Sequence, residues 1–285
     1  MANIRLIKGR IKSAKNIAQI TKAMELVSAA KMKKAQAQAL AGKLYAQKIF
    51  EMVVVLASRT ISAKHPLLQK PKHLAGRRLV ILISSNKGLC GGLNTNLFRF
   101  FSQHYHASKN FDAVTAGKKG ASFLSHFGGS LKADFSNSSS FVAEVPAITE
   151  LVTREYTAGL YDGVDLIYNE FVNVVKQVPK RKTILPLTVE SLETPVEEHG
   201  DFLIEPSIDE VFESLLPHYL ENQIRDAALQ AEASEHSARM VAMRNATDNA
   251  LSLVDDLTLV YNKARQEKIT YEITDMITAS MTVSV

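Results

Sequence analysis

Apolar and small residues recur at alternating intervals of three and four through the first 56 positions of the chain. They form one continuous series: Ile4, Ile7, Ile11, Ala14, Ala18, Thr21, Glu25, Ser28, Met32, Ala35, Ala39, Gly42, Ala46, Ile49, Val53 and Leu56. This spacing places the series on one side of an α-helix, as in the seam of a coiled coil, and Glu25 is its clearest exception. A helix of that length spans roughly 80 Å and cannot bury its own apolar side, so it needs a partner.

The C-terminal end carries a second series of the same kind. It changes phase twice: Leu220, Ile224, Ala227, Ala231, Ser234, Ala238 and Val241, then Met243, Ala246, Ala250, Leu253, Leu257, Val260 and Ala264, then Ile269, Ile273 and Met276. Phase changes of this kind alter supercoiling locally. Pro217 interrupts the run, so we expect a kink or a late helix start there. We predict that residues 1–58 and 207–285 pair as a long antiparallel coiled coil. The alternative is two amphipathic helices lying on a globular core, which their length disfavours.

Between the two ends the pattern alternates between short apolar runs and helical segments. Strands are expected at 78–84, 111–115, 164–174 and 182–189, and helices at 94–106, 118–126 and 147–160. The last strand would pair with its predecessor across a turn at Pro179 and Lys180, and a linker would follow over 193–206. This alternation predicts a Rossmann-like α/β domain with a mostly parallel sheet, inserted between the long helices as residues 75–195.

Composition changes this picture little. With 46% hydrophobic and 22% charged residues the chain resembles an ordinary globular protein, and it contains no apolar run long enough for a transmembrane helix. The single cysteine, Cys90, excludes an internal disulfide and a cysteine-based zinc site. The N-terminus lacks the continuous apolar region of a secretory signal, and a basic, amphipathic mitochondrial transit peptide is the alternative interpretation.

The charge is unevenly distributed. Of the net charge of +5, residues 1–59 contribute +10 and the remaining residues −5. A basic helix on a mildly acidic body indicates an acidic partner, either nucleic acid or an acidic protein surface, unless the charges only solvate one helix face.

Two glycine-rich turns are candidates for phosphate binding. Residues 88–92 read GLCGG after the first expected strand, and residues 117–120 read GKKG after the second. Neither has the glycine order of a dinucleotide-binding turn or the Ser/Thr of a phosphate loop, so tight turns with close helix–sheet packing are favoured. The histidines are scattered and no carboxylate pair stands out. We therefore expect no catalytic residue, no cofactor and no metal site.

Four segments resemble the γ subunits of F-type ATP synthases, in the family's order and across nearly the whole chain. They are IAQITKAMELVSAAKM at 17–32, GLCGGLN at 88–94, ARMVAM with ATDN at 238–249, and LVYNKARQ with ITYE at 259–272. Together they are highly specific. The resemblance implies the non-catalytic central rotor of a proton-translocating ATP synthase, which couples proton-driven rotation to ATP synthesis in a surrounding ring of α and β subunits.

The resemblance also implies partners and site residues. Arg265, Gln266 and Thr270 match residues that hydrogen-bond a loop of a β subunit. Lys22 and Met24, with the basic face extended by Lys31 and Lys33, match a region facing an acidic lever segment of β. Phe202, Ile204 and Glu205 match the foot that meets the ε subunit and the membrane c-ring. The implied location is the cytoplasmic side of a bacterial plasma membrane, with membrane contact only through the complex; the mitochondrial matrix side is the alternative.

Two other functions are compatible with parts of the sequence. A Rossmann-like enzyme with helical arms would bind nucleotide tightly as an isolated chain. A basic coiled-coil protein that binds nucleic acid would show a steep salt dependence, but residues 1–59 lack arginine clusters with interleaved aromatic residues.

Overall fold

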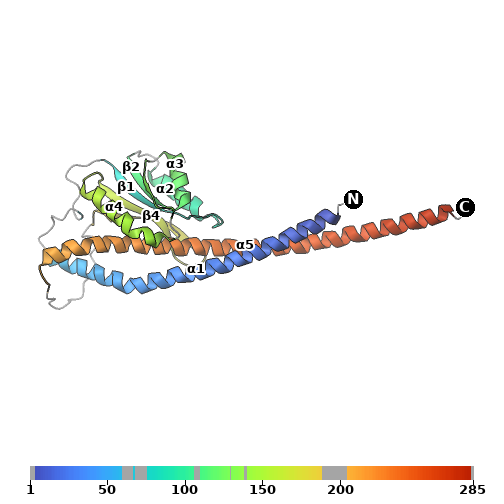
Figure 1. The fold of residues 1–285 in the computed structure, drawn as a ribbon, viewed down its shortest axis with the longest axis horizontal. Coiled ribbons are helices and arrows are strands. Elements are labelled where there is room, and N and C mark those ends of the chain that lie inside the picture. The colour runs from blue at the N-terminus through green and yellow to red at the C-terminus, as the bar shows by residue number, and fades with distance from the viewer. Residues whose placement is uncertain are drawn as a thin grey trace. The chain divides into compact units, whose positions relative to one another are not determined.

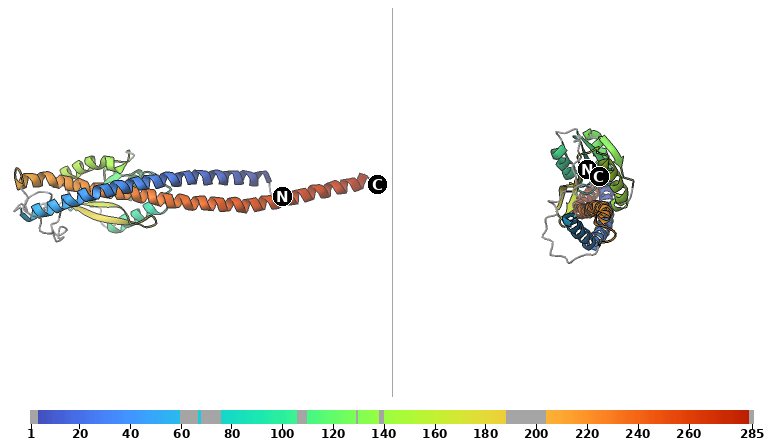
Figure 2. Two further views of the ribbon diagram at one scale, coloured as in Figure 1. Left: turned by 90° about the horizontal axis from the view of Figure 1, so that it is seen from below. Right: turned by 90° about the vertical axis from the view of Figure 1, so that its left-hand side faces the viewer.

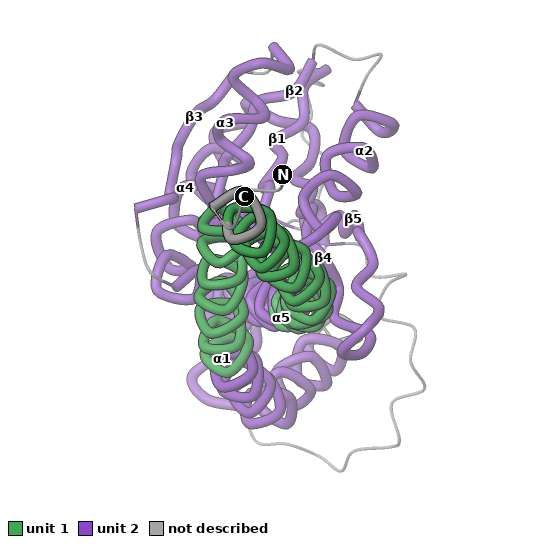
Figure 3. The backbone as a smooth tube through the Cα atoms, turned by 90° about the vertical axis from the view of Figure 1, so that its right-hand side faces the viewer, with its two compact units in different colours: residues 1–28, 240–285 green, residues 29–239 purple. Residues whose placement is uncertain are grey.

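The computed structural model describes residues 4–59, 67, 76–105, 110–128, 130–137, 140–187 and 204–283. The chain divides into two compact units, residues 1–28 with 240–285 and residues 29–239, which are described separately (Figure 3). The elements, in chain order, are α1 Ile4–Arg59, β1 Arg78–Ile83, α2 Leu93–Tyr105, β2 Phe111–Ala116, α3 Lys118–Phe127, β3 Ser130–Asp134, the 3-10 helix η1 Phe141–Glu144, α4 Val145–Thr157, β4 Gly163–Phe171, β5 Gln177–Leu185 and α5 Ile208–Val283.

The larger unit contains a five-stranded sheet with the strand order β3-β2-β1-β4-β5. The first four strands are parallel and β5 is antiparallel to β4, which confirms the mixed α/β fold with a mostly parallel sheet. β1 lies in the middle, and successive side chains point to opposite faces. Leu79, Ile81 and Ile83 enter one core, and Val80 and Leu82 the other.

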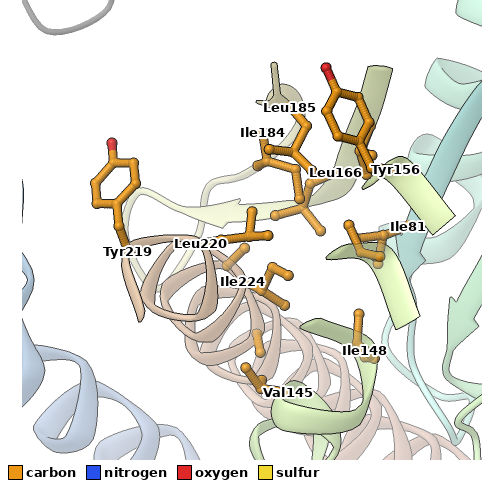
Figure 4. Close-up of a cluster of buried hydrophobic side chains, with 14 of the residues drawn as sticks. Ile81, Val145, Ile148, Tyr156, Leu166, Ile184, Leu185, Tyr219, Leu220 and Ile224 are labelled. Atoms are coloured by element: carbon orange, nitrogen blue, oxygen red, sulfur yellow. The ribbon is translucent and has the colours of Figure 1, made fainter. Parts of the chain in front are cut away.

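Helices cover both faces of this sheet (Figure 1). On one face α2 and α3 bury Leu97, Phe101 and Leu124 against the strands. On the other face α4 and α5 pack together, and Ile148 of α4 and Ile224 of α5 are almost completely buried (Figure 4). The apolar stripe of α5 is therefore part of the core of the α/β domain in this unit.

The N-terminal series is confirmed as one buried stripe on α1. Ten of its sixteen members are buried, five are half-buried, and Gly42 is exposed. Glu25, the polar exception, is half-buried and pairs with Lys22 at 2.9 Å. In each unit α1 runs alongside α5 in the opposite direction (Figures 1 and 2). This confirms the antiparallel pairing of long N- and C-terminal helices.

The second phase of the C-terminal series is partly wrong. In the smaller unit α5 buries Met243, Thr247, Ala250, Val254 and Ala264, and its half-buried positions are Met240, Val241, Ala242, Ala246, Leu257 and Tyr261. Leu253 and Val260, which the sequence placed in the seam, are each 50% exposed. Leu253, Val254 and Leu257 lie so close together that the sequence leaves the phase of the buried stripe ambiguous. Packing against α1 buries Val254 rather than Leu253, and it also buries the polar Thr247.

Three further expectations need correction. The predicted turn at Pro179 and Lys180 lies inside β5, where these residues pair with Asn169 and Tyr168. The reversal occurs before Gln177, and the Asn173 side chain accepts the amides of Val175 and Lys176 there. β3 was not predicted, because its side chains are largely exposed and show no alternation. α5 begins at Ile208 and continues through Pro217, so the late helix start is wrong.

A hydrogen bond between two buried threonines joins the helices of the smaller unit. The hydroxyl oxygens of Thr21 and Thr247 lie 2.7 Å apart, and each hydroxyl also contacts a carbonyl of its own helix. Thr21→Val or Thr247→Val alone is expected to reduce the free energy of unfolding by about 1 kcal/mol. The double substitution should cost less than the sum, because neither hydroxyl then loses its partner.

Urea unfolding of the four proteins measures this coupling. Thr274→Val is the matched control, since Thr274 is exposed and bonds only within its own helix among the contacts described. Strictly additive effects of Thr21→Val and Thr247→Val would contradict the prediction.

Candidate partner-binding surfaces

The C-terminal segment of α5 is the most exposed helical surface of the chain that the structure describes. All residues from 265 to 279 are exposed. They include large apolar side chains: Ile269 is 42% exposed, Tyr271 55% and Met276 73%. A helix that displays apolar residues in this way indicates a surface covered by another molecule.

The three predicted β-binding residues lie at the start of this segment. Arg265, Gln266 and Thr270 are all exposed. Gln266 and Thr270 are four residues apart and therefore share a helix face. The Thr270 hydroxyl donates to the Gln266 carbonyl at 3.0 Å. The structure thus brings these two together on one surface, with Arg265 beside them on the same turn.

A groove lies between α1 and α5 in the smaller unit. Its volume is about 710 Å³, and it is lined on α1 by Leu6, Ala14 and Ile17 and on α5 by Ala250, Leu253 and Leu257, with polar residues at its margin. The side chains of Leu253 and Ile17, at 50% and 52% exposure, remain open to solvent there. The groove extends the apolar surface of this unit across both helices.

The predicted basic residues lie on α1. Lys22 and Met24 belong to the smaller unit, where Lys22 is exposed and Met24 is half-buried. Lys31 and Lys33 belong to the larger unit and are exposed. The charge of Lys31 also acts on Glu235 and His236 of α5. An acidic partner would therefore meet lysines in both units.

The predicted foot residues differ from one another. Phe202 lies outside the described residues, as do residues 193–203 of the expected linker. Ile204 is half-buried and packs against the core that contains α4 and α5, whereas Glu205 is exposed. Of the two that the structure describes, Glu205 is thus the one that presents its side chain to solvent.

The glycine-rich turn at 117–120 is not built to hold a phosphate. A Cβ added to Gly117 would lie 2.1 Å from the Ser84 carbonyl oxygen, so this turn is filled by the loop that follows β1. The Gly120 amide donates to the Ser84 hydroxyl at 2.7 Å. The prediction of tight turns with close packing is confirmed for this turn.

The turn at 88–92 is attached to α5 by Arg239, which the sequence did not single out for this role. Arg239 donates to the carbonyls of Lys87 and Gly88 at 3.1 and 3.3 Å, and it pairs with Glu235 at 2.7 Å. Burial raises the pKa of the Glu235 carboxyl, and Arg239 opposes that shift. Burial, together with the charges of Arg239 and Lys31, lowers the pKa of His236 to about 4, so His236 is neutral at pH 7.

The described part of the chain contains no cluster of three or more His, Cys, Asp or Glu side chains that could bind a metal ion. None of its described helices combines the length and apolar character that crossing a membrane requires.

Comparison with known proteins places these surfaces in context. The family model for ATP synthase matches residues 3–283. A protein of Opitutus terrae named ATP synthase gamma chain is 43% identical, over 98% of this chain and 98% of its own length. One of the same name from Dehalococcoides mccartyi is 42% identical, over 97% of this chain and 98% of its own length.

Solved structures share the fold. A chain from the central stalk and c-ring structure of Tetrahymena thermophila mitochondrial ATP synthase is 30% identical, with a TM-score of 0.59, over 80% of this chain and 99% of its own. A chain of the Euglena gracilis mitochondrial ATP synthase matches 98% of this chain and 94% of its own length, with a TM-score of 0.65 at 21% identity.

Proposed function

The chain belongs to the family of ATP synthase gamma chains and is a non-catalytic subunit of that enzyme, and from this premise we propose that it works as the rotating shaft of an F-type ATP synthase. The observation that carries the proposal is the exposed apolar surface of α5 between 265 and 279. Exposed apolar residues gathered on one helix in this way mark a surface that a partner covers. A ring of α and β subunits provides such a partner.

The ring would meet the shaft at two places. Arg265, Gln266 and Thr270 bind a loop of a β subunit, because their exposed polar groups share one end of the apolar surface. Lys22, Lys31 and Lys33, with Met24 among them, face an acidic lever segment of β. The excess of positive charge over residues 1–59 supports this assignment, since opposite charges steer and orient an encounter.

The α/β domain would form the foot of the shaft. Glu205, with Ile204 and Phe202, meets the ε subunit and the c-ring, and the exposure of Glu205 supports this contact. The complex is attached to the cytoplasmic side of a bacterial plasma membrane, in keeping with the sequence identity to the gamma chains of Opitutus terrae and Dehalococcoides mccartyi.

Rotation has a direct physical consequence in this arrangement. The two helices present different side chains around their circumference, so each β subunit of the ring meets a different contact at a given angle. A partner with several conformations shifts toward the one that its contact favours. Turning the shaft therefore changes which β subunit is in which binding state, while the bond chemistry stays in β.

Replacing both Arg265 and Gln266 with alanine is expected to weaken assembly of the α/β ring on this chain or to lower its ATPase turnover. The double substitution removes a cation and an amide at an interface, and losses of about tenfold are typical for two contacts of this kind. Assembly is measured by co-purification of the ring with this chain, and turnover by ATP hydrolysis of the purified complex.

Glu267→Ala with Lys268→Ala is the matched control. These two residues adjoin the first pair, are equally exposed and remove a similar number of polar groups. Unchanged assembly and turnover of the first variant would exclude Arg265 and Gln266 from the interface, and an equal loss in both variants would show that the contact is not specific to them.

A further inference from the structure

The α/β domain has the topology of sheets that bind ligands, and its ligand position can be located. β1 pairs with β2 on one side and with β4 on the other, so the strand order reverses between β1 and β4. In open α/β sheets, ligands bind outside the carboxyl ends of the strands at such a switch point. The loop at this end of β1 contains the glycine-rich turn 88–92, and this end of β4 leads into the hairpin to β5.

One stretch of α5 occupies this position. The Ser234 hydroxyl donates to the carbonyl of Asn169 at 3.0 Å, and the Ser237 hydroxyl to that of Val174 at 2.7 Å. Both serines are fully buried. Arg239 reaches the carbonyls of Lys87 and Gly88 on the other side of the switch point. The residues 232–239 of α5 thus bond to the loops of both β1 and β4, where another sheet of this topology would hold its ligand.

A third attachment lies beyond the end of β3. The Glu232 carboxylate accepts the amide of Phe141 at 2.8 Å and the Ser140 hydroxyl at 2.7 Å, just before α4. Three separate segments of the α/β domain are therefore fixed to eight consecutive residues of one helix. Because these bonds leave in several directions around α5, they oppose rotation of the helix about its own axis within the domain.

The contact to the glycine-rich turn is the one made by a buried ion pair. Arg239 and Glu235 are only 7% and 8% exposed, and charge-assisted bonds at such positions are stronger than neutral ones. Within this loop Asn94 donates to the Ser85 hydroxyl at 2.6 Å, and Leu89 adopts a positive φ of 61°. The carbonyls of Lys87 and Gly88 accept from the Arg239 cation, whereas a phosphate-binding turn presents amides.

We propose that residues 232–239 form a torsional joint, in which α5 occupies the ligand position of the α/β domain and Arg239, paired with Glu235, fixes the rotational setting of the helix. The inference rests on the proposed rotor function. Torque applied to the foot then passes into α5 through this joint, and a loosened joint lets the foot turn without turning the helix by the same angle. Arg239 is a positioning residue, because it acts on partner subunits only through α5.

The test removes the joint without leaving a buried charge unpaired. Glu235→Gln with Arg239→Gln deletes both charges and nearly conserves volume, which avoids the cost of an isolated buried ion. The control, Glu221→Gln with Arg225→Gln, deletes the same pair type on the same helix, where both side chains are partly exposed and form no described hydrogen bond to another element. The complete enzyme, with its membrane sector in vesicles, is assayed for ATP hydrolysis and ATP-driven proton pumping.

We expect the first variant to hydrolyse ATP while the number of protons pumped per ATP falls about threefold or more. The reason is that losing one charge-assisted hydrogen bond changes the equilibrium constant between the joined and loosened states several-fold. The control should pump like the parent. An unchanged ratio in the first variant overturns the proposal. Failure of the parent complex to couple hydrolysis to pumping would instead contradict the rotor function itself, so the two failures are distinguishable.

A second variant covers the case in which the first does not assemble. Ser234→Ala with Ser237→Ala disconnects the β4–β5 hairpin from α5 without touching a charge, and the pumping ratio is again expected to fall. An unchanged ratio here, or loss of assembly in both variants while the control assembles, would show that the contacts serve folding alone and would overturn the joint.

Discussion

Replacing Asp165 with alanine is expected to lower the free energy of unfolding by about 3 kcal/mol, because its buried carboxylate accepts hydrogen bonds from β1, β5 and α2. Asp165 is completely buried on β4. It accepts two bonds from Arg78, at 2.6 and 2.7 Å, and one each from Arg181, Tyr105 and Thr183. Removing it would leave two cations and the buried Tyr105 hydroxyl without their acceptor.

Glu170→Gln on the same strand is the matched control. Glu170 pairs with Lys180 at 2.6 Å, but both side chains are substantially exposed. Such surface pairs contribute only about 0–1 kcal/mol. Urea unfolding of the two variants and the parent measures the difference. Equal losses for Asp165→Ala and Glu170→Gln would contradict a buried network at Asp165.

The effect of Asp165 should also depend on pH. Burial by itself raises the pKa of this carboxyl, but the hydrogen bonds from Arg78, Tyr105 and Thr183 outweigh burial and hold the pKa below the ordinary value of 3.8. A group with a depressed pKa in the folded state stabilises the protein above its unfolded pKa and loses that contribution as the pH falls through its folded pKa. The difference in free energy of unfolding between the parent and Asp165→Ala is therefore expected to have its full size at pH 7. It should shrink as the pH falls below 3.8, the ordinary pKa of the carboxyl.

Gly117→Ala is expected to destabilise the protein by about 2–5 kcal/mol, since it combines backbone strain with a steric clash. Gly117 has a φ of 117°, and an added Cβ would lie 2.1 Å from a backbone oxygen of Ser84. Backbone on both sides prevents an easy adjustment. The loops after β1 and β2 would have to separate, and this separation would also disturb the Ser84 contacts to Gly120.

Substitutions at two other glycines separate the cost of backbone strain from the cost of the steric clash. Gly128 has a φ of 88° but open space around its Cβ position, so Gly128→Ala should cost only the strain, about 1 kcal/mol. Gly42 lies in α1 with neither constraint, and Gly42→Ala should stabilise the helix by about 0.5–1 kcal/mol. Thermal unfolding of the three variants should follow this order, and a Gly117→Ala variant as stable as Gly128→Ala would contradict the clash.

Much of the secondary structure follows from local patterns. The stripe on α1 was predictable from Ile4 to Leu56, because its members recur at alternating intervals of three and four, which keeps them on one side of the helix. β1 was predictable for a related reason, since strands covered on both faces read as continuous apolar runs. β3 escaped prediction because it lies at the sheet edge with exposed side chains, so burial imposes no pattern on its sequence.

Positions were mistaken where two local signals compete. Pro179 and Lys180 resemble a turn, but β5 is an edge strand, and an edge strand tolerates a proline. In α5, Leu253, Val254 and Leu257 offer two helical stripes of similar quality. Only the surface of α1 decides between them, and it buries Val254.

The sequence by itself determined the two long helices, the inserted α/β domain, the basic character of the first helix and the family. Each of these depends on periodicity, on composition or on short segments that resemble the family, and all of these signals are local in the chain. Only the tertiary structure decided what Ser234, Glu235, Ser237 and Arg239 do. Ser234, Ser237 and Arg239 bind carbonyl groups that lie 63 to 152 residues away in sequence, and the packing of α5 against the sheet brings them within hydrogen-bonding distance. Glu235 pairs with Arg239 on the same helix.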